Sequence, residues 1–291
     1  MSDNPTRTPI VVVGIDGSED AMHAAAWAAD EARCFGATLS LVHALESPLN
    51  PAHPAEPPPH DERRRAQGVA LLEQARDRLT AGHPGLEISK ELSARPPAET
   101  LIDLSRRCDL LVMGTRGHGG FTGMMLGSVS NHVATDSRCP LIVVHGAQPR
   151  PSPGEIVLGL DVDEAPEPID FALRAASVLG RGVRAVRAFD PRPPAYEGGR
   201  EAARLPQGDR DDVERAMERL LTLPQARYRL SVSREAHQGH PVPVLIEAAR
   251  GAHLIVVGSH RRRPPYSFGP GHIVHGLLSH SDTPVAVVPI P

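Results

Sequence analysis

A glycine-rich segment in the first half of the chain holds the residues with the clearest capacity for chemistry. Six glycines fall within residues 114–127, directly after an apolar run and directly before Ser128 and Ser130. Glycine lets backbone N–H groups approach a ligand without an intervening side chain, and a helix N-terminus adds unpaired N–H groups and a positive dipole end. The segment therefore predicts an anion cradle, best suited to the phosphates of a nucleotide, with a helix that begins at Gly127–Ser128. A flexible glycine linker is the alternative, although a linker has no need of a strand–helix junction.

Other phosphate-binding and acyl-transfer motifs are absent from the sequence. Lys90 is the only lysine among 31 basic residues and stands in a predicted strand, so a P-loop and a Schiff-base site are both disfavoured. A dinucleotide fingerprint that starts at Gly117 and Gly119 would need glycine where Thr122 stands, and the Gly-x-Ser-x-Gly elbow of hydrolases does not occur. Any nucleotide must therefore be held chiefly by glycine backbone and a helix N-terminus.

The elements that must position this segment occur twice. Three stretches of the first half recur in the second half at an offset of 144 or 145 residues: 9–16 as 154–161, 109–114 as 253–258, and 139–144 as 283–288. Three matches in one register indicate a tandem duplication with a seam near residue 148. We therefore expect two domains, 1–148 and 149–291.

Each half alternates short apolar runs with longer helical patterns. In the first half, runs that are apolar on both faces predict strands over residues 10–15, 38–44, 86–93, 109–114 and 141–145. Such runs are typical of parallel strands covered on both sides, and their alternation with helices indicates βαβ units. The predicted fold class is α/β, with two tandem doubly wound domains, each a five-stranded parallel sheet within a three-layer sandwich. Ligands of such domains bind beyond the carboxyl ends of the strands, where the strand order switches direction.

Helices and loops follow from local signals. Asp16-Gly17-Ser18-Glu19 offers an N-cap for the first helix. Trp27 is predicted to lie in the core beside a stripe of small residues that lets this helix approach the sheet, namely Ala21, Ala24, Ala25, Ala28 and Ala32. The basic run 63–65 is predicted to open an exposed helix. Proline-dense stretches predict extended loops over 48–59, 149–168 and 191–206, because proline cannot continue a helix.

Charge and composition narrow the class of protein. A net charge of −4 argues against a general nucleic-acid binder. No apolar run approaches the roughly 18 residues of a membrane span and no secretory signal is visible, so we expect a cytoplasmic protein. Cys34, Cys108 and Cys139 lie in apolar runs and are predicted to be buried and reduced, without a disulfide framework. Neither they nor the histidines of the second half have the spacing of metal ligands, so no metal site is predicted.

The spacing Gly114-x2-Gly117-x9-Gly127-Ser128 resembles the Gly-x2-Gly-x9-Gly-Ser/Thr pattern of the nucleotide-binding universal stress proteins. The ends of the first two strands are also similar to motifs of that family, and the resemblance covers the chain twice. It implies an adenine-nucleotide-hydrolase-like or flavodoxin-like domain that binds ATP, with or without Mg²⁺. Asp16 would lie on the adenosine side, Ala44 and Met113 near the adenine, and the glycines and serines around ribose and phosphates. The implied binding residues are Asp16, Gly17, Ser18, Ala44, Met113, Gly114, Gly117, Gly127, Ser128, Val129 and Ser130.

The second half departs from this pattern. Asp161, Gly258 and Gly271 keep their positions, but Arg261 stands where the first half has Gly117, and His272 where it has Ser128. Val162-Asp163 replaces Gly17-Ser18, and Pro264-Pro265 stiffens the following turn. We therefore expect one competent nucleotide site, in the first domain, and a degenerate motif in the second.

These patterns favour an ATP-binding regulatory protein that responds to stress or energy state without rapid turnover. A slow ATPase or phosphotransferase is one alternative, for which Asp16 is the only acid that the resemblance places near the site. A nucleotide-free interaction scaffold is the other. The apolar terminal strands 141–144 and 285–288 are predicted to pair, in a homodimer or within one chain, because exposed apolar sheet edges tend to associate. Neither nucleic acid nor a membrane is an expected partner.

Overall fold

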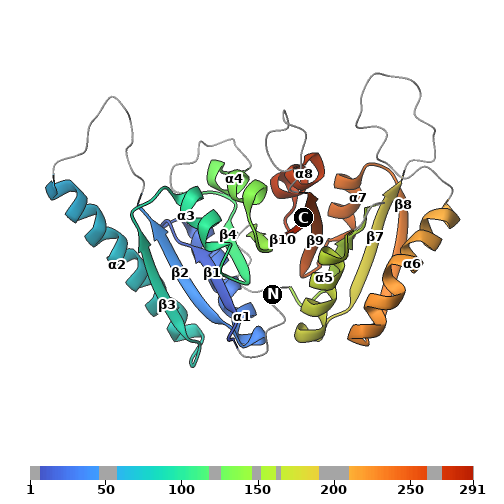
Figure 1. Cartoon of the computed structure of the whole chain (residues 1–291), viewed down its shortest axis with the longest axis horizontal. Coiled ribbons are helices and arrows are strands. Elements are labelled where there is room, and N and C mark those ends of the chain that lie inside the picture. The colour runs from blue at the N-terminus through green and yellow to red at the C-terminus, as the bar shows by residue number, and fades with distance from the viewer. Residues whose placement is uncertain are drawn as a thin grey trace, which may run out of the picture. The chain divides into compact units, whose positions relative to one another are not determined.

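The computed structural model describes residues 7–45, 58–117, 126–145, 152–161, 165–189, 210–260 and 271–290. The chain divides into two compact units, Met1–Pro151 and Ser152–Pro291. Figure 1 shows that each unit is a sheet with helices on both faces.

The first unit is built on five parallel strands. Their order across the sheet is β3-β2-β1-β4-β5, and every neighbouring pair is parallel. The bounds are β1 Ile10–Gly14, β2 Thr38–Ala44, β3 Ile88–Ser93, β4 Leu110–Gly114 and β5 Leu141–Val144. Residues of β4 and β5 are buried throughout, as expected for strands that are apolar on both faces. The predicted strands are confirmed to within two residues at either end.

Four helices complete the three layers of this unit. They are α1 Glu19–Phe35, α2 Pro58–Gly82, α3 Pro97–Leu104 and α4 Ser128–Asp136. Helix α1 packs beside α2, and α3 packs beside α4, so the two pairs cover opposite faces of the sheet (Figure 1). The predicted doubly wound α/β domain is therefore confirmed.

Helix α1 shows how local sequence signals place an element. Ser18 is its N-cap, and the Ser18 hydroxyl accepts a hydrogen bond from the backbone N–H of Ala21 over 3.1 Å. Gly36 ends the helix in the left-handed conformation, with φ of 60°. The five alanines of the predicted stripe and Trp27 are all buried, so the stripe faces the sheet as expected.

The prediction that the proline-dense stretches are entirely extended is wrong at two places. Helix α2 begins at Pro58 and α5 at Pro166, within two of those stretches. The first turn of a helix tolerates proline, because its N–H groups have no acceptor inside the helix and its φ suits the ring. Helix α2 thus begins five residues before the basic run that was expected to open it. Residues 46–57 and 190–209 lie outside the described part of the chain.

The second unit repeats the architecture of the first. Its parallel strands run in the order β10-β9-β6-β7-β8, the same order as in the first unit when read from the opposite end. The strands are β6 Ile156–Gly159, β7 Val183–Phe189, β8 Val232–Gln238, β9 Leu254–His260 and β10 Val285–Ile290. The helices are α5 Pro166–Leu179, α6 Arg210–Tyr228, α7 Pro241–Ala248 and α8 His272–His280.

One outer strand of each unit is charged. In β3, Lys90 forms an ion pair with Glu73 of α2, and Glu91 lies 3.4 Å from Arg107. Strand β8 carries Arg234 and Glu235, which pair with groups on neighbouring elements. The strands at the other edges, β5 and β10, are apolar and largely buried.

The cysteine prediction is wrong in part. Cys108 and Cys139 are buried as expected, but Cys34 is exposed. It lies two residues beyond Ala32, which at about 100° per residue turns it away from the buried stripe. Among the described helices, none is both long and apolar enough to cross a membrane.

Candidate functional site

The crevice of the first unit lies where β1 and β4 are neighbours. From β1 the chain winds outward through β2 to β3, and it then crosses to β4 and β5 on the other side. Helices on opposite faces therefore diverge at the carboxyl ends of β1 and β4, which is where doubly wound domains bind ligands. Asp16 follows β1 and the glycine-rich segment follows β4, so both predicted motifs reach this crevice.

The turn after β1 fixes the carboxylate of Asp16. Its Oδ1 accepts hydrogen bonds from the backbone N–H of Ser18 at 3.0 Å and from the Ser18 hydroxyl at 2.6 Å. Gly17 lies between them with φ of 89°, a conformation that favours glycine. Behind this turn, Nδ1 of His43 donates to the carbonyl oxygen of Ile15 over 2.7 Å. The Asp16 carboxylate is thus half-buried and held in one orientation.

Gly117 lies directly against this carboxylate. A Cβ atom at position 117 would overlap Oδ2 of Asp16, so any other residue here would require the carboxylate or the backbone to shift. The approach leaves Oδ1 on Ser18 and turns Oδ2 towards the glycine segment. The acid and the backbone of Gly117 therefore lie side by side beyond the carboxyl ends of β1 and β4.

Gly114 allows α1 to pack closely against β4. A Cβ atom there would lie 2.8 Å from the backbone carbonyl of Asp20, in the first turn of α1. The absent side chain is thus needed for α1 to approach β4, and it gives no direct argument for ligand approach at this position.

The first turn of α4 supplies the donors of the cradle. Gly127 is the N-cap, with φ of −69° and no side-chain cap, and the first helical bond runs from Asn131 N–H to the Gly127 carbonyl over 3.0 Å. The N–H groups of Ser128, Val129 and Ser130 consequently have no acceptor within the helix. Ser128 is exposed, so its N–H group and hydroxyl can reach a ligand. N–H groups at the positive end of a helix dipole are of the kind that binds anions in proteins.

The hydroxyl of Ser130 is hydrogen-bonded to the backbone at the end of β4. The side chain is 3% exposed and donates to the carbonyl oxygen of Gly114 over 3.1 Å, with that of Thr115 at 3.4 Å. A further bond joins the N–H of Gly127 to Thr115 O at 2.9 Å. Ser130 therefore holds the start of α4 against the end of β4, and its contribution to a ligand is through its backbone.

Ala44 and Met113 lie near the same edge of the sheet. Ala44 ends β2 and is half-buried, while Met113 is the penultimate residue of β4 and 6% exposed. Residues 118–125 of the glycine-rich segment, including His118 and the three glycines between Gly117 and Gly127, lie outside the described residues, so their place in the cradle stays a prediction.

Sequence reasoning missed a second acid at this site. Asp20, in the first turn of α1, accepts from the hydroxyl of Thr115 over 3.0 Å, and its Oδ2 lies 3.9 Å from Nε of Arg116. Arg116 is 63% exposed, so a cation stands within the glycine segment even though lysine is absent. The only available signal was that Asp20 follows the N-cap Ser18 by two residues, which places it in the first turn.

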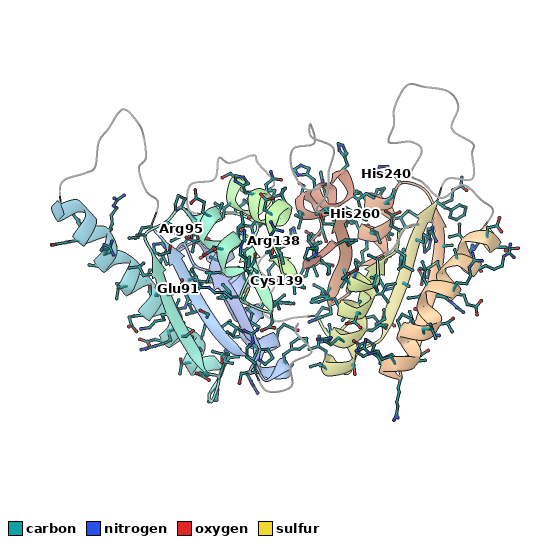
Figure 2. The ribbon with its side chains drawn as sticks, viewed as in Figure 1. Glu91, Arg95, Arg138, Cys139, His240 and His260 are labelled. Atoms are coloured by element: carbon teal, nitrogen blue, oxygen red, sulfur yellow. The ribbon has the colours of Figure 1, made fainter. Side chains whose placement is uncertain are left out.

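The corresponding region of the second unit is built differently. Helix α5 begins after Ala165, an N-cap without a side-chain hydrogen bond, whereas α1 has Ser18. At Gly258, a Cβ would lie 3.0 Å from Cγ of Pro168, so that position is closed by packing as Gly114 is. His240 and His260 follow β8 and end β9, in the upper part of the second unit in Figure 2. Arg261–Arg263, Val162, Asp163 and Pro264-Pro265 lie outside the described residues.

Metal-binding side chains do not cluster in the described part of either unit. Within the described ranges, no group of three or more His, Cys, Asp or Glu residues is arranged to hold a metal ion.

The fold and site define a class: duplicated, doubly wound α/β proteins with a glycine-rich segment and a helix N-terminus at the switch point of the first domain. Comparison with known proteins specifies the family. The model of the Universal stress protein family matches residues 8–145 and residues 154–289. The chain therefore belongs to the universal stress protein family, with one copy of the domain in each half.

Individual relatives agree with this assignment. A universal stress protein of Mycolicibacterium smegmatis is 30% identical over 294 residues, which is 96% of both chains. The crystal structure of a universal stress protein from Archaeoglobus fulgidus covers 96% of this chain and 98% of its own, with a TM-score of 0.68 and 16% identity, and shows the same fold. A universal stress protein solved in complex with cAMP is 29% identical, covers 47% of this chain and 97% of its own, and has a TM-score of 0.37.

Proposed function

We propose that the first unit binds ATP and that the protein acts in the cytoplasm as a regulator that responds to stress or energy state without rapid turnover. The observation that carries the proposal is the close approach of Gly117 to the Asp16 carboxylate, beside the first-turn N–H groups of α4 that have no acceptor within the helix. A hydrogen-bond acceptor and a phosphate-sized cluster of donors face one crevice there. This pairing suits a nucleotide, which has sugar hydroxyls at one end and an anion at the other.

Each end of the nucleotide has a fitting group in the first unit. The N–H groups of Ser128 and Val129 and the hydroxyl of Ser128 would hold phosphate oxygens. The Asp16 carboxylate, which Ser18 holds in one orientation, would accept from a ribose hydroxyl. Ala44 and Met113 would border the adenine. Arg116 adds one positive charge on the rim.

The residues also fit ATP with or without Mg²⁺. Mg²⁺ bound to a nucleotide keeps several waters and takes one or two carboxylates in addition to phosphate oxygens. Asp16 and Asp20 are the carboxylates near the cradle, and Asp20 is already engaged by Thr115 and Arg116. When bound, the ion would neutralise phosphate charge.

We propose further that only the first unit is a competent site. The second unit lacks the side-chain cap at the start of α5, and its α8 begins with His272 in place of Ser128. One nucleotide per chain is the expected stoichiometry.

Mass spectrometry and calorimetry test the proposal. Ligand released from the purified protein by denaturation is identified by mass, and isothermal titration with ATP, with and without Mg²⁺, gives affinity and stoichiometry. Gly117→Arg, which copies the second half into the first, is expected to abolish binding. Gly271→Ala is the matched control, because a Cβ at Gly271 meets no atom within 4 Å and should leave binding intact. If the wild-type chain neither carries nor binds an adenine nucleotide, the proposal is wrong, and two equivalent sites per chain would refute the single-site part.

The terminal strands support a proposal about assembly. The apolar strands β5 and β10 favour association through their edges, either between two chains or within one. Sedimentation of the purified protein at several concentrations separates a dimer of chains from a monomer.

A further inference from the structure

Two buried cysteines lie side by side in the first unit, away from the nucleotide cradle. Cys108 is in the turn between α3 and β4. Cys139, labelled in Figure 2, is in the turn between α4 and β5. Because β4 and β5 are neighbouring parallel strands, both turns meet at the amino edge of the sheet. The two Sγ atoms are 3.5 Å apart, and the residues are 8% and 6% exposed. This is the separation of two thiols in contact.

The two thiols have different acid strengths. The hydrogen bond between the two sulfurs, together with burial, raises the pKa of Cys108. The same bond, helped by the hydroxyl of Ser137, lowers the pKa of Cys139 against the opposing effect of burial. Ser137 Oγ lies 3.9 Å from that sulfur. Cys139 is therefore the better nucleophile of the pair, since the thiolate is the reactive form.

The second unit shows that the fold does not require these thiols. At an offset of 144, Ala252 occupies the place of Cys108 and Thr283 that of Cys139. The turn itself is retained: Ser137 donates to the carbonyl of Cys139 over 2.7 Å, and Ser281 donates to that of Thr283 over 2.8 Å. The same turn thus closes with and without a sulfur, and the paired thiols are a feature of the first unit.

We propose that Cys108 and Cys139 are a reversible oxidation site that closes an intramolecular disulfide on reaction with a low-molecular-weight disulfide. The Cys139 thiolate attacks one sulfur of the small disulfide, a mixed disulfide forms, and the first small thiol leaves. Cys108 then loses its proton and attacks the Cys139 sulfur, which expels the second small thiol. Two protein thiols are oxidised and one small disulfide is reduced to two thiols.

The bond would enclose the nucleotide cradle. Residues 109–138 lie between the two cysteines and contain Gly114, Gly117 and the whole of α4. A cross-link between the ends of this segment restricts the unfolded chain, which raises stability. The disulfide therefore ties the folding of the cradle to the oxidation state of the cell.

Oxidised glutathione is a suitable probe. The full-length protein is treated with it, alkylated, and digested with trypsin without reduction. Cleavage after Arg107 and Arg138 gives peptides that begin at Cys108 and at Cys139. The expected result is a disulfide-linked pair of these peptides, lost on reduction, and a Tm several degrees higher for the oxidised protein. Cys34, which is exposed, serves as an internal measure of reagent exposure. Complete modification of Cys34 without any Cys108–Cys139 link would overturn the proposal.

Variants separate the roles of the two thiols. Cys108→Ser is expected to trap glutathione on Cys139, whereas Cys139→Ser should leave Cys108 largely unmodified. Equal trapping on both would contradict the assigned order of attack. The double variant C108A/C139T copies the pair of the second unit, so it should fold with an unchanged Tm in reductant and show no rise on oxidation. A rise in Tm on oxidation of this variant would show that the effect has another origin.

Discussion

Gly117→Ala is the most direct test of the geometry at the cradle. The backbone at this position does not have a positive φ, so alanine can adopt the same conformation. The change therefore adds one methyl group, and this group overlaps Oδ2 of Asp16. The carboxylate must turn away, or the glycine segment must lift from it.

The cost can be worked out from the bonds that hold the carboxylate. Asp16 accepts bonds of 3.0 and 2.6 Å from Ser18, and a hydrogen bond to a charged group contributes about 1.5–3 kcal/mol. Asp16 is half-buried, so water can replace part of the energy of these hydrogen bonds. We therefore expect the free energy of unfolding to fall by about 1–2 kcal/mol. At about 2–4 °C per kcal/mol, Tm should fall by roughly 2–8 °C. A similar loss in binding corresponds to roughly 5–30-fold weaker affinity for ATP.

Differential scanning calorimetry and isothermal titration measure both quantities on one preparation. Gly82→Ala at the end of α2 is the matched control, because its added Cβ meets no atom within 4 Å. It should leave ATP affinity unchanged. If Gly117→Ala has the Tm and the ATP affinity of the wild type, the methyl group is accommodated and the close approach of Gly117 to Asp16 does not shape the site.

Three further substitutions test other contacts. Ser130→Ala removes the bond to the Gly114 carbonyl and should lower the free energy of unfolding by about 1 kcal/mol, measured by urea unfolding, with weaker ATP binding as α4 loosens. Ser18→Ala removes the cap of α1, with an expected cost of about 1 kcal/mol in the same assay; no change would mean that water replaces the cap. The phenol of Tyr228 is partly buried and donates a 2.6 Å hydrogen bond to Asp170, and burial and this bond both raise the pKa of Tyr228. The folded state then keeps the phenol proton longer than the unfolded chain, so this stabilisation is present below about pH 10 and is lost as pH rises through the folded pKa. Tyr228→Phe should flatten the alkaline fall in stability, and an unchanged pH profile would contradict this.

The strands of the first unit could be predicted closely because each is apolar on both faces. A strand that is apolar on both faces is typical of the interior of a parallel sheet that helices cover on both sides. The start of α4 at Ser128 and the cap at Ser18 were also predictable, since both depend on residues adjacent in sequence. The helix start at Pro58 was missed because the rule against proline was applied to the first turn, where it does not hold.

The rest of the site depends on contacts between distant segments. The carboxylate of Asp20 reaches Thr115 only because α1 lies against β4, across 95 residues of sequence. Likewise, Cys108 and Cys139 meet because β4 and β5 are neighbours, and nothing in their spacing of 31 residues shows it. Gly114 illustrates the converse: its motif position suggested a ligand contact, whereas the space is taken by the backbone of Asp20.

The charged strands β3 and β8 have a consequence for solubility at high concentration. Each carries a lysine or arginine beside a glutamate on an otherwise open sheet edge, and desolvating these charges opposes the docking of a further strand. Only the apolar edge of each unit is left for strand pairing. Each unit therefore offers one such edge, and a unit whose apolar edge is already paired presents only a charged strand to further association.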